Sequence, residues 1–108
     1  MANAADRDDL KKQKNKEKFK NKQEQMDMKF ILGTEQGRRV LWRYLGHAGV
    51  FEQSAHASGS WTYFNEGRRS LGLRLLSEIT ETDANLYLKM MLEHQKQGEE
   101  NADTDNAD

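Results

Sequence analysis

The amino-acid sequence predicts an all-α protein with a small helical domain of about three short helices. A long basic N-terminal helix or arm precedes this domain, and an acidic disordered C-terminal tail follows it. The 108 residues include no proline, which would interrupt a long helix. Apolar residues in the centre recur at helical spacing, and the two ends of the chain carry opposite net charge.

The charge distribution divides the chain into three parts. Residues 1–32 hold nine Lys/Arg and six Asp/Glu, whereas residues 98–108 hold five Asp/Glu and no Lys/Arg. Only 35% of the residues are hydrophobic, which is too few for the whole chain to bury a core of normal size. We therefore expect a basic arm over 1–32, partly helical or disordered, a helical domain over 33–97 and a disordered acidic tail over 98–108.

The first two helices follow from helix-favouring residues and from capping signals. After a disordered start over 1–9, nothing breaks a helix over 10–32, and its last turns are expected to dock through Met26 and Phe30. Gly33 is expected to end it. Thr34 is expected to cap a second helix that runs to about Gly46. The apolar face predicted for this second helix consists of Val40, Leu41, Tyr44, Leu45 and Ala48.

The glycine- and serine-rich residues 46–60 predict a connecting loop, in which Val50 and Phe51 form an apolar plug. Ser60 is expected to cap a third helix over about 61–79, and Thr80 or Thr82 a fourth over about 83–97 that ends at Gly98. The buried side predicted for the third helix consists of Trp61, Phe64, Leu71, Leu75 and Ile79, widened by Leu73 and Leu76. The fourth is expected to carry Leu86, Tyr87, Met90, Met91 and His94.

A Gly-Arg-Arg phrase occurs twice, and each copy leads into an apolar helix. The residues are Gly37, Arg38 and Arg39 in the first copy, and Gly67, Arg68 and Arg69 in the second. One interpretation is anion binding, because arginine grips phosphate with two donors. The favoured interpretation is packing, in which glycines mark the approach of two helices and acids such as Glu35 and Glu66 pair with the arginines three or four residues later.

A second candidate site is the lysine segment, in which seven lysines are accompanied by one acid. Three interpretations stay open: a solvated arm, a sequence-tolerant contact with nucleic-acid phosphates, and pairing with acidic protein, including the acidic tail of another copy. The lysines concerned are Lys11, Lys12, Lys14, Lys16, Lys18, Lys20 and Lys22.

The sequence lacks the patterns of an enzyme or a metal protein. There is no cysteine, and His47, His56 and His94 do not have metal-ligand spacing. Ser54, Ser58 and Ser60 have no orienting acid at a suitable spacing, and neither a nucleophile elbow nor a phosphate loop is found. We therefore expect no catalytic residues, no cofactor and no metal site, and we expect the aromatic residues to pack in the core, with Trp42 and Tyr63 as alternative interface residues.

The sequence also bounds the location of the protein. No apolar run approaches the roughly 18–20 residues of a membrane span, and no hydrophobic run near the N-terminus predicts a signal peptide. We expect no membrane contact, and the absence of cysteine suits a protein made in the cytosol.

Three stretches, EQGRRVLWRYLGHAGVF from Glu35, FNEGRRSLGLRLL from Phe64 and LYLKMMLEH from Leu86, carry a family resemblance. Over roughly residues 30–94 the chain resembles a family of small tailed-phage proteins, typified by a protein of a short-tailed Bordetella phage and encoded among virion morphogenesis genes. The resemblance implies a phage protein made late in the host cytoplasm and built into or near the virion. It supplies no catalytic residues.

These observations favour a non-enzymatic virion-associated or assembly protein whose helical domain binds another virion protein. The alternative is a nucleic-acid-binding accessory protein that contacts DNA through the lysine segment, and a third possibility is an inhibitor of a host protein. The sequence leaves the oligomeric state open.

Overall fold

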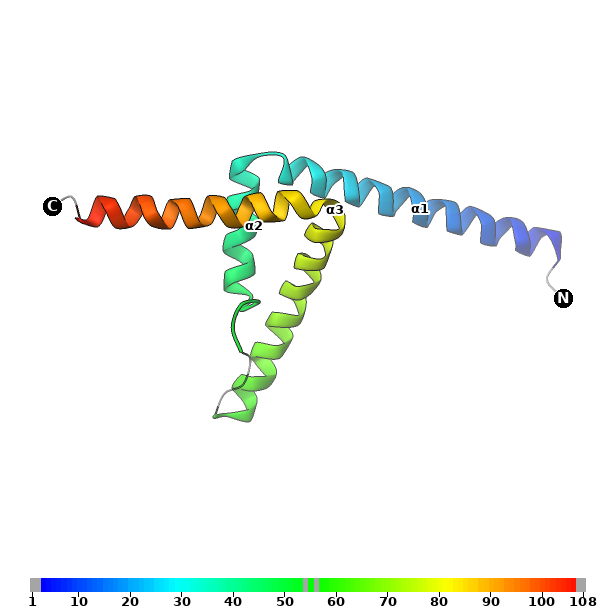
Figure 1. The fold of residues 1–108 in the computed structure, drawn as a ribbon. Helices are drawn as coiled ribbons and strands as arrows, with labels where there is room; N and C mark the ends of the chain where they lie inside the picture. The colour runs from blue at the N-terminus through cyan, green and yellow to red at the C-terminus, as the bar shows by residue number, and fades with distance from the viewer. Residues whose placement is uncertain (1–2, 54, 56, 107–108) are drawn as a thin grey trace.

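The computed structural model describes residues 3–53, 55 and 57–106, and these residues form three helices without a strand (Figure 1). Helix α1 spans Ala4–Leu32, α2 spans Glu35–His47 and α3 spans Gly59–Asn106. The predicted all-α class is confirmed. Residues 48–58 connect α2 to α3, in the place where the glycine-rich stretch predicts a loop.

Helix α3 bends sharply at Asp83, where the backbone is extended (φ −163°, ψ 101°). The bend divides α3 into a first segment, residues 59–82, and a second segment, residues 84–106, which correspond to the predicted third and fourth helices. Asp83 caps the second segment, since its Oδ1 accepts hydrogen bonds from the backbone N–H groups of Asn85 (3.0 Å) and Leu86 (3.2 Å). The prediction that Thr80 or Thr82 provides this cap is wrong.

Those two threonines have a different use. The hydroxyl of Thr80 donates to the carbonyl of Leu76 (3.0 Å), and that of Thr82 donates to the carbonyl of Glu78 (2.7 Å). Both hydroxyls therefore bond back into the last turn of the first segment, and neither is available to the turn that follows.

The ends of the helices differ from several expectations. Asn3 caps α1 by accepting from the N–H of Asp6 (2.9 Å), so the residues from Ala4 onward, expected to be disordered, are helical. Helix α3 begins at Gly59, which places Ser60 inside its first turn, and it continues through Gly98. Residues 98–106 are thus helical where a disordered tail was expected, and 107–108 lie outside the described residues.

Thr34 caps α2 as predicted, with its hydroxyl oxygen accepting from the N–H of Gly37 (3.0 Å). Helix α2 and the first segment of α3 lie side by side as a stem (Figure 1). At the top of this stem, α1 and the second segment of α3 extend toward opposite ends of the molecule (Figure 1). The resulting molecule measures 76 × 39 × 15 Å and is therefore elongated and flat.

The core lies where the three helices meet at the top of the stem. The buried hydrophobic residues are Met28, Leu32, Leu45, Val50, Ile79 and Met90. Partly buried residues pack around them, namely Leu41, Trp42, Ala48, Leu75, Leu76, Leu86 and Tyr87. Helix α1 therefore docks through Met28 and Leu32, whereas Met26 and Phe30, which were expected to dock, are 63% and 79% exposed.

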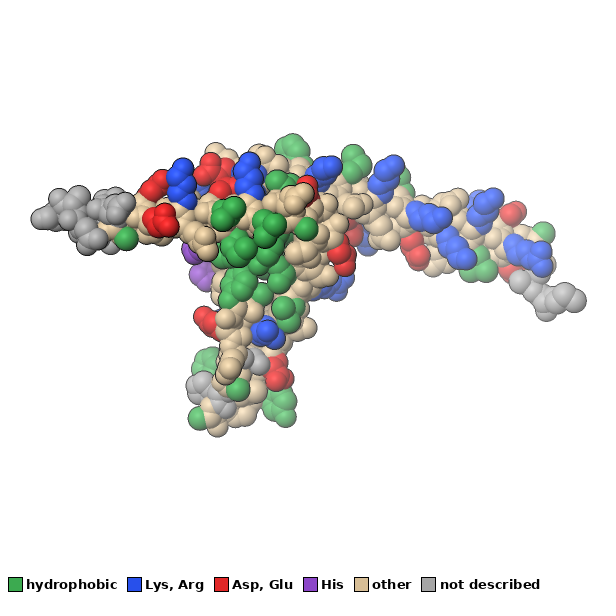
Figure 2. All heavy atoms as spheres, in the orientation of Figure 1, with side chains coloured by type: hydrophobic (Ala, Val, Ile, Leu, Met, Phe, Trp, Pro, Cys, Tyr) green, Lys and Arg blue, Asp and Glu red, His purple; other side chains and the backbone are tan. Residues whose placement is uncertain are grey.

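The thin architecture explains why other predicted core residues are exposed. On α2, Val40 and Tyr44 are exposed, and on the first segment of α3 so are Trp61, Phe64 and Leu71. Each helix buries only the face that touches a neighbour, so the apolar residues on the outward faces have no described helix to cover them. Figure 2 shows apolar side chains gathered on the visible face around the junction of the stem with the second segment of α3.

The solvent-accessible surface area and the radius of gyration also show that the molecule is not compact. The chain exposes 8863 Å², whereas a compact monomer of this mass is expected to expose roughly 6,200 Å². Its radius of gyration is 20.1 Å, against roughly 13 Å for a compact domain of this length. Among the described helices, none is both long enough and apolar enough to cross a membrane.

Candidate functional site

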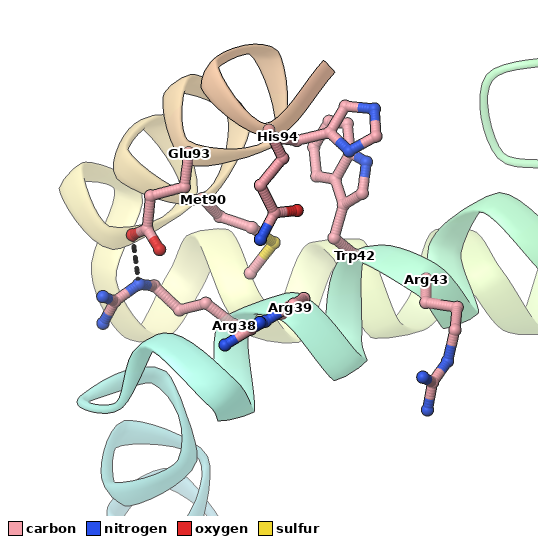
Figure 3. A pocket seen from close by; sticks show the side chains of 8 residues that line it. Arg38, Arg39, Trp42, Arg43, Met90, Glu93 and His94 are labelled. Atoms are coloured by element: carbon pink, nitrogen blue, oxygen red, sulfur yellow. Dashed lines mark hydrogen bonds and ion pairs between the residues drawn. The ribbon is translucent and has the colours of Figure 1, made fainter. Parts of the chain in front are cut away.

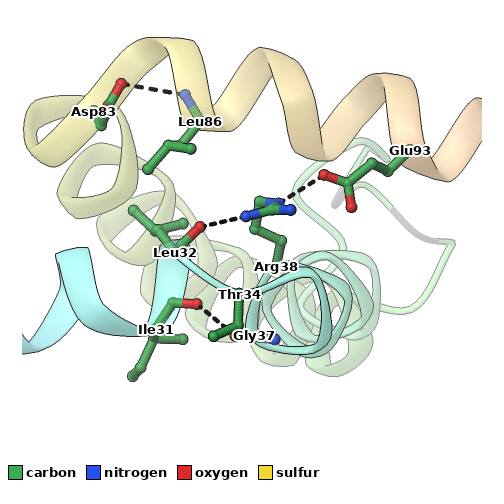
Figure 4. Close-up of polar contacts among 8 residues, drawn as sticks. All are labelled: Ile31, Leu32, Thr34, Gly37, Arg38, Asp83, Leu86 and Glu93. Carbon is green, nitrogen blue, oxygen red and sulfur yellow. Dashed lines mark hydrogen bonds and ion pairs between the residues drawn. The ribbon is translucent and has the colours of Figure 1, made fainter.

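Arg38 of the first Gly-Arg-Arg phrase lies at the meeting point of all three helices (Figure 4). Its side chain is buried, its Nε donates to Glu93 Oε1 (2.6 Å), and its Nη1 donates to the carbonyl of Leu32 (2.7 Å). That carbonyl belongs to the last turn of α1, where backbone oxygens lack partners within the helix. Arg38 therefore joins the end of α1 to the start of α2 and to the second segment of α3.

Arg38, Arg39 and Arg69 do not make the predicted intrahelical ion pairs among the described residues. Within the part of the chain that the structure describes, Glu35 pairs with neither Arg38 nor Arg39, and Glu66 does not pair with Arg69. The Nε of Arg69 is buried and has no hydrogen-bond partner within the described parts of the chain. Arg38 thus pairs with an acid on another helix, Glu93, and not with Glu35.

Arg68 lies over the connection between α2 and α3. Its guanidinium is 6.0 Å from the centre of the Phe64 ring, and its Nη2 is 3.5 Å from Asn65 Oδ1. A Cβ placed on Gly49 would come within 3.1 Å of that Nη2. Gly49 also has a positive φ of 72°, a conformation that favours glycine.

The glycines of the two phrases also differ from each other. A Cβ on Gly37 would clash with the backbone carbonyl of Ile31, so Gly37 permits the tight turn between α1 and α2. A Cβ on Gly67 would meet nothing within 4 Å, and the prediction of a close approach there is wrong. The close approach is at Gly72, where a Cβ would lie 2.5 Å from the Cβ of Ala48 and 2.6 Å from Cγ2 of Val50.

A hollow of about 230 Å³ lies between α2 and the second segment of α3 (Figure 3). The His94 ring packs against Trp42 at a centroid distance of 4.9 Å, and Trp42 also stacks on Phe51 at 5.1 Å. The hollow is lined by Arg38, Arg39, Trp42, Arg43, Met90, Glu93, His94 and Gln97. It is smaller than the roughly 300–1,000 Å³ of typical small-molecule sites, and its size suits one protein side chain.

Two features of this hollow escape sequence reasoning. Glu93 is 55 residues from Arg38, and His94, which was expected on the fourth helix and is exposed there, packs its ring on that of Trp42 from α2. Neither partnership leaves a local spacing signal, because each joins distant parts of the chain. His56 lies outside the described residues, and no cluster of possible metal ligands is found among the described ones.

The lysine segment lies in the part of α1 that projects away from the stem (Figure 1). All seven lysines are exposed on a continuous helix, and they are distributed around its axis. Figure 2 shows basic side chains along this arm. The structure thus separates the lysine segment from Gly-Arg-Arg, since the lysines are free of the core and Arg38 is part of it.

A family model described as Bbp19-like phage protein matches residues 28–92. The chain belongs to this family. The match confirms the resemblance to small phage proteins that the two Gly-Arg-Arg phrases carry. No curated protein and no solved structure matches the chain.

The part that matches the Bbp19-like family coincides with the packed centre. It begins at Met28, the first core residue of α1, and it includes the last, Met90. The lysine segment of α1 and the acidic end of α3 lie outside it. The family match therefore concerns the three-helix junction, and the charged ends lie outside the matched residues.

Proposed function

We propose that this Bbp19-like protein is a non-enzymatic component of phage assembly whose helical centre binds another virion protein. The observation that supports the proposal most is the open architecture, which exposes about 2,700 Å² more than a compact monomer of this mass. A stable protein–protein contact needs roughly 800 Å² from each partner, so this surface is ample.

The hollow beside Trp42 is the most specific part of this surface. Its lining combines the buried Met90 and the partly buried Trp42 with Arg39 and Arg43, which are exposed. An apolar side chain of the partner fits against Trp42 and Met90, and a neighbouring acid of the partner complements the arginines. The lining residues include no serine, cysteine or threonine beside a base, which favours binding over nucleophilic chemistry.

Quantitative mass spectrometry of purified virions, together with the particle types formed by a deletion mutant, tests the proposal. We expect the protein at a fixed copy number in virions or in a precursor particle, and stalled assembly in the deletion. A protein absent from all particles, with normal assembly without it, would refute the proposal.

DNA binding through the lysine segment is the second candidate function, because its seven lysines are exposed on a projecting helix. Phosphate contacts release counterions, so the logarithm of the binding constant should fall with the logarithm of salt by roughly 0.9 per contact. Changing Lys11, Lys12, Lys14 and Lys16 to glutamine should reduce this slope by up to about 3.6. A chain that does not bind duplex DNA at low salt rules this function out.

A further inference from the structure

Helix α1 carries an exposed row opposite the face by which it docks. Phe19, Gln23, Met26 and Phe30 are separated by four, three and four residues, which places them in line along the helix. All four are exposed. The docked residues Met28 and Leu32 lie on the other side, so no described part of the chain covers this row.

The second segment of α3 carries a row with the same spacing. Leu88, Leu92, Gln95 and Glu99 are again separated by four, three and four residues, and all four are exposed. The core residue Met90 lies on the opposite side of this segment. Helix α1 and the second segment of α3 thus each carry an exposed row with the same four-three-four spacing.

We propose that α1 of one copy packs antiparallel against the second segment of α3 of a second copy. This self-association goes beyond the proposed binding of another virion protein. In the register that matches the two rows, Phe30 lies against Leu88 and Met26 against Leu92. Gln23 then faces Gln95, and Phe19 lies against the aliphatic stem of Glu99. Matched four-three-four spacing is what two helices need to interdigitate their side chains along a shared seam.

Charge selects this pairing over the alternatives. The register continues the lysine segment, which has a net charge of +6, alongside the end of α3 over residues 98–106, which has a net charge of −4 in the sequence. Pairing α1 with another α1 would oppose two lysine-rich helices, and a parallel pairing with α3 would carry the lysines away from the acidic end. The second copy is therefore the occupant whose acidic helix end complements the lysine segment of α1.

The contact cannot form within one chain. In a single copy, α1 and the second segment of α3 run in the same direction, and their free ends project to opposite ends of the molecule (Figure 1). In an antiparallel contact the paired helices of the two copies run in opposite directions, as they do when a two-fold axis relates the copies. The same axis generates a second, identical contact. The result is a closed dimer with two α1–α3 pairs.

Sedimentation equilibrium of the full chain at low and high salt tests the oligomeric state. We expect twice the chain mass of 12.5 kDa at low salt, and dissociation as salt screens the charged pairing. Leu92→Lys should raise the dimer dissociation constant by at least about tenfold. Leu73→Lys, which changes an exposed leucine of the first segment, is the matched control and should leave the constant unchanged.

Disulfide trapping tests the register, since the chain has no cysteine of its own. A copy with Met26→Cys is mixed with a copy with Leu92→Cys under mild oxidation, and Leu73→Cys replaces Leu92→Cys in the control. Because a disulfide needs Cα atoms within about 7 Å, we expect the mixed disulfide with Leu92→Cys only. Equal yields in both mixtures overturn the register.

A monomeric mass at low salt overturns the dimer. This holds also if the lysine segment of the monomer binds duplex DNA. Circular dichroism of each variant confirms that the helices are retained, which we expect because the substituted side chains are exposed. Virion mass spectrometry does not depend on self-association, so failure of the dimer is distinguishable from failure of the proposed assembly role.

Discussion

Arg38 is the residue on which the three-helix junction depends most. Replacing it with alanine leaves Glu93 without its partner and the carbonyl of Leu32 without its donor. Hydrogen bonds to charged groups contribute about 1.5–3 kcal/mol, so we expect Arg38→Ala to lower the free energy of unfolding by roughly 2–4 kcal/mol. Urea denaturation followed by circular dichroism measures this.

Arg39→Ala is the control for Arg38→Ala, because Arg39 is exposed and belongs to the same Gly-Arg-Arg phrase. It should change the free energy of unfolding by no more than about 0.5 kcal/mol. Equal effects of the two substitutions would contradict the role assigned to Arg38.

The sequence indicated that Arg38 matters but not what it contacts. Glu35 is three residues away and satisfies the spacing rule for a helical ion pair, whereas the actual partner, Glu93, belongs to another helix. Spacing rules describe contacts within an element. A buried arginine, however, takes the acceptors that the tertiary fold brings to it, and the sequence does not encode these as a local pattern.

Helix packing at the stem depends on Gly72, which leads to a second prediction. Alanine is favoured over glycine in a helix by about 1 kcal/mol, but the added Cβ at Gly72 would crowd Ala48 and Val50. Overpacking costs about 1–3 kcal/mol, so Gly72→Ala should lower the unfolding free energy or at best leave it unchanged.

Gly67→Ala should have the opposite sign, because its Cβ meets nothing. We expect stabilisation of up to about 1 kcal/mol. Thermal and chemical denaturation of the two variants side by side give the comparison, and stabilisation by both would show that the stem is less tightly packed than described.

The bend in α3 provides a third prediction. Asp83→Ala removes the side chain that accepts from Asn85 and Leu86. Loss of such a cap costs about 0.5–2 kcal/mol, whereas asparagine at the same position preserves the acceptor. Asp83→Ala should therefore destabilise the protein, Asp83→Asn should stay close to the original, and equal destabilisation by both would contradict the capping role.

At this scale the sequence predicted the helices better than their orientation. Helical spacing located α2 and both segments of α3, and Thr34 was correctly chosen as a cap. The docking face of α1 was wrong because that helix has two apolar rows, one with Met28 and Leu32 and one with Met26 and Phe30. Both rows have helical spacing, and periodicity alone does not say which one meets the chain's own core.

For the whole molecule, the division of the chain into folding units leads to a fourth prediction. The predicted domain over 33–97 omits Met28 and Leu32, which are two of the buried core residues, and the carbonyl that Arg38 binds. Loss of one such side chain to alanine costs about 2–5 kcal/mol. A fragment over 33–97 should therefore unfold at low denaturant or lack a cooperative transition.

A fragment over 24–97 restores these groups and should unfold cooperatively. Circular dichroism and urea denaturation compare the two fragments. A fragment over 33–97 as stable as the longer one would show that α1 contributes nothing to the core.

The projecting part of α1 has a consequence for experiments on the protein in solution. Before Met28 no residue of α1 is buried, so its backbone amides are protected only by hydrogen bonds within the helix. A solitary helix opens readily, and these amides should exchange with deuterated water much faster than those around Ile79. Any partner that covers α1 will slow the exchange of the amides that it covers. The exchange rates therefore show which residues of α1 are in contact with the partner.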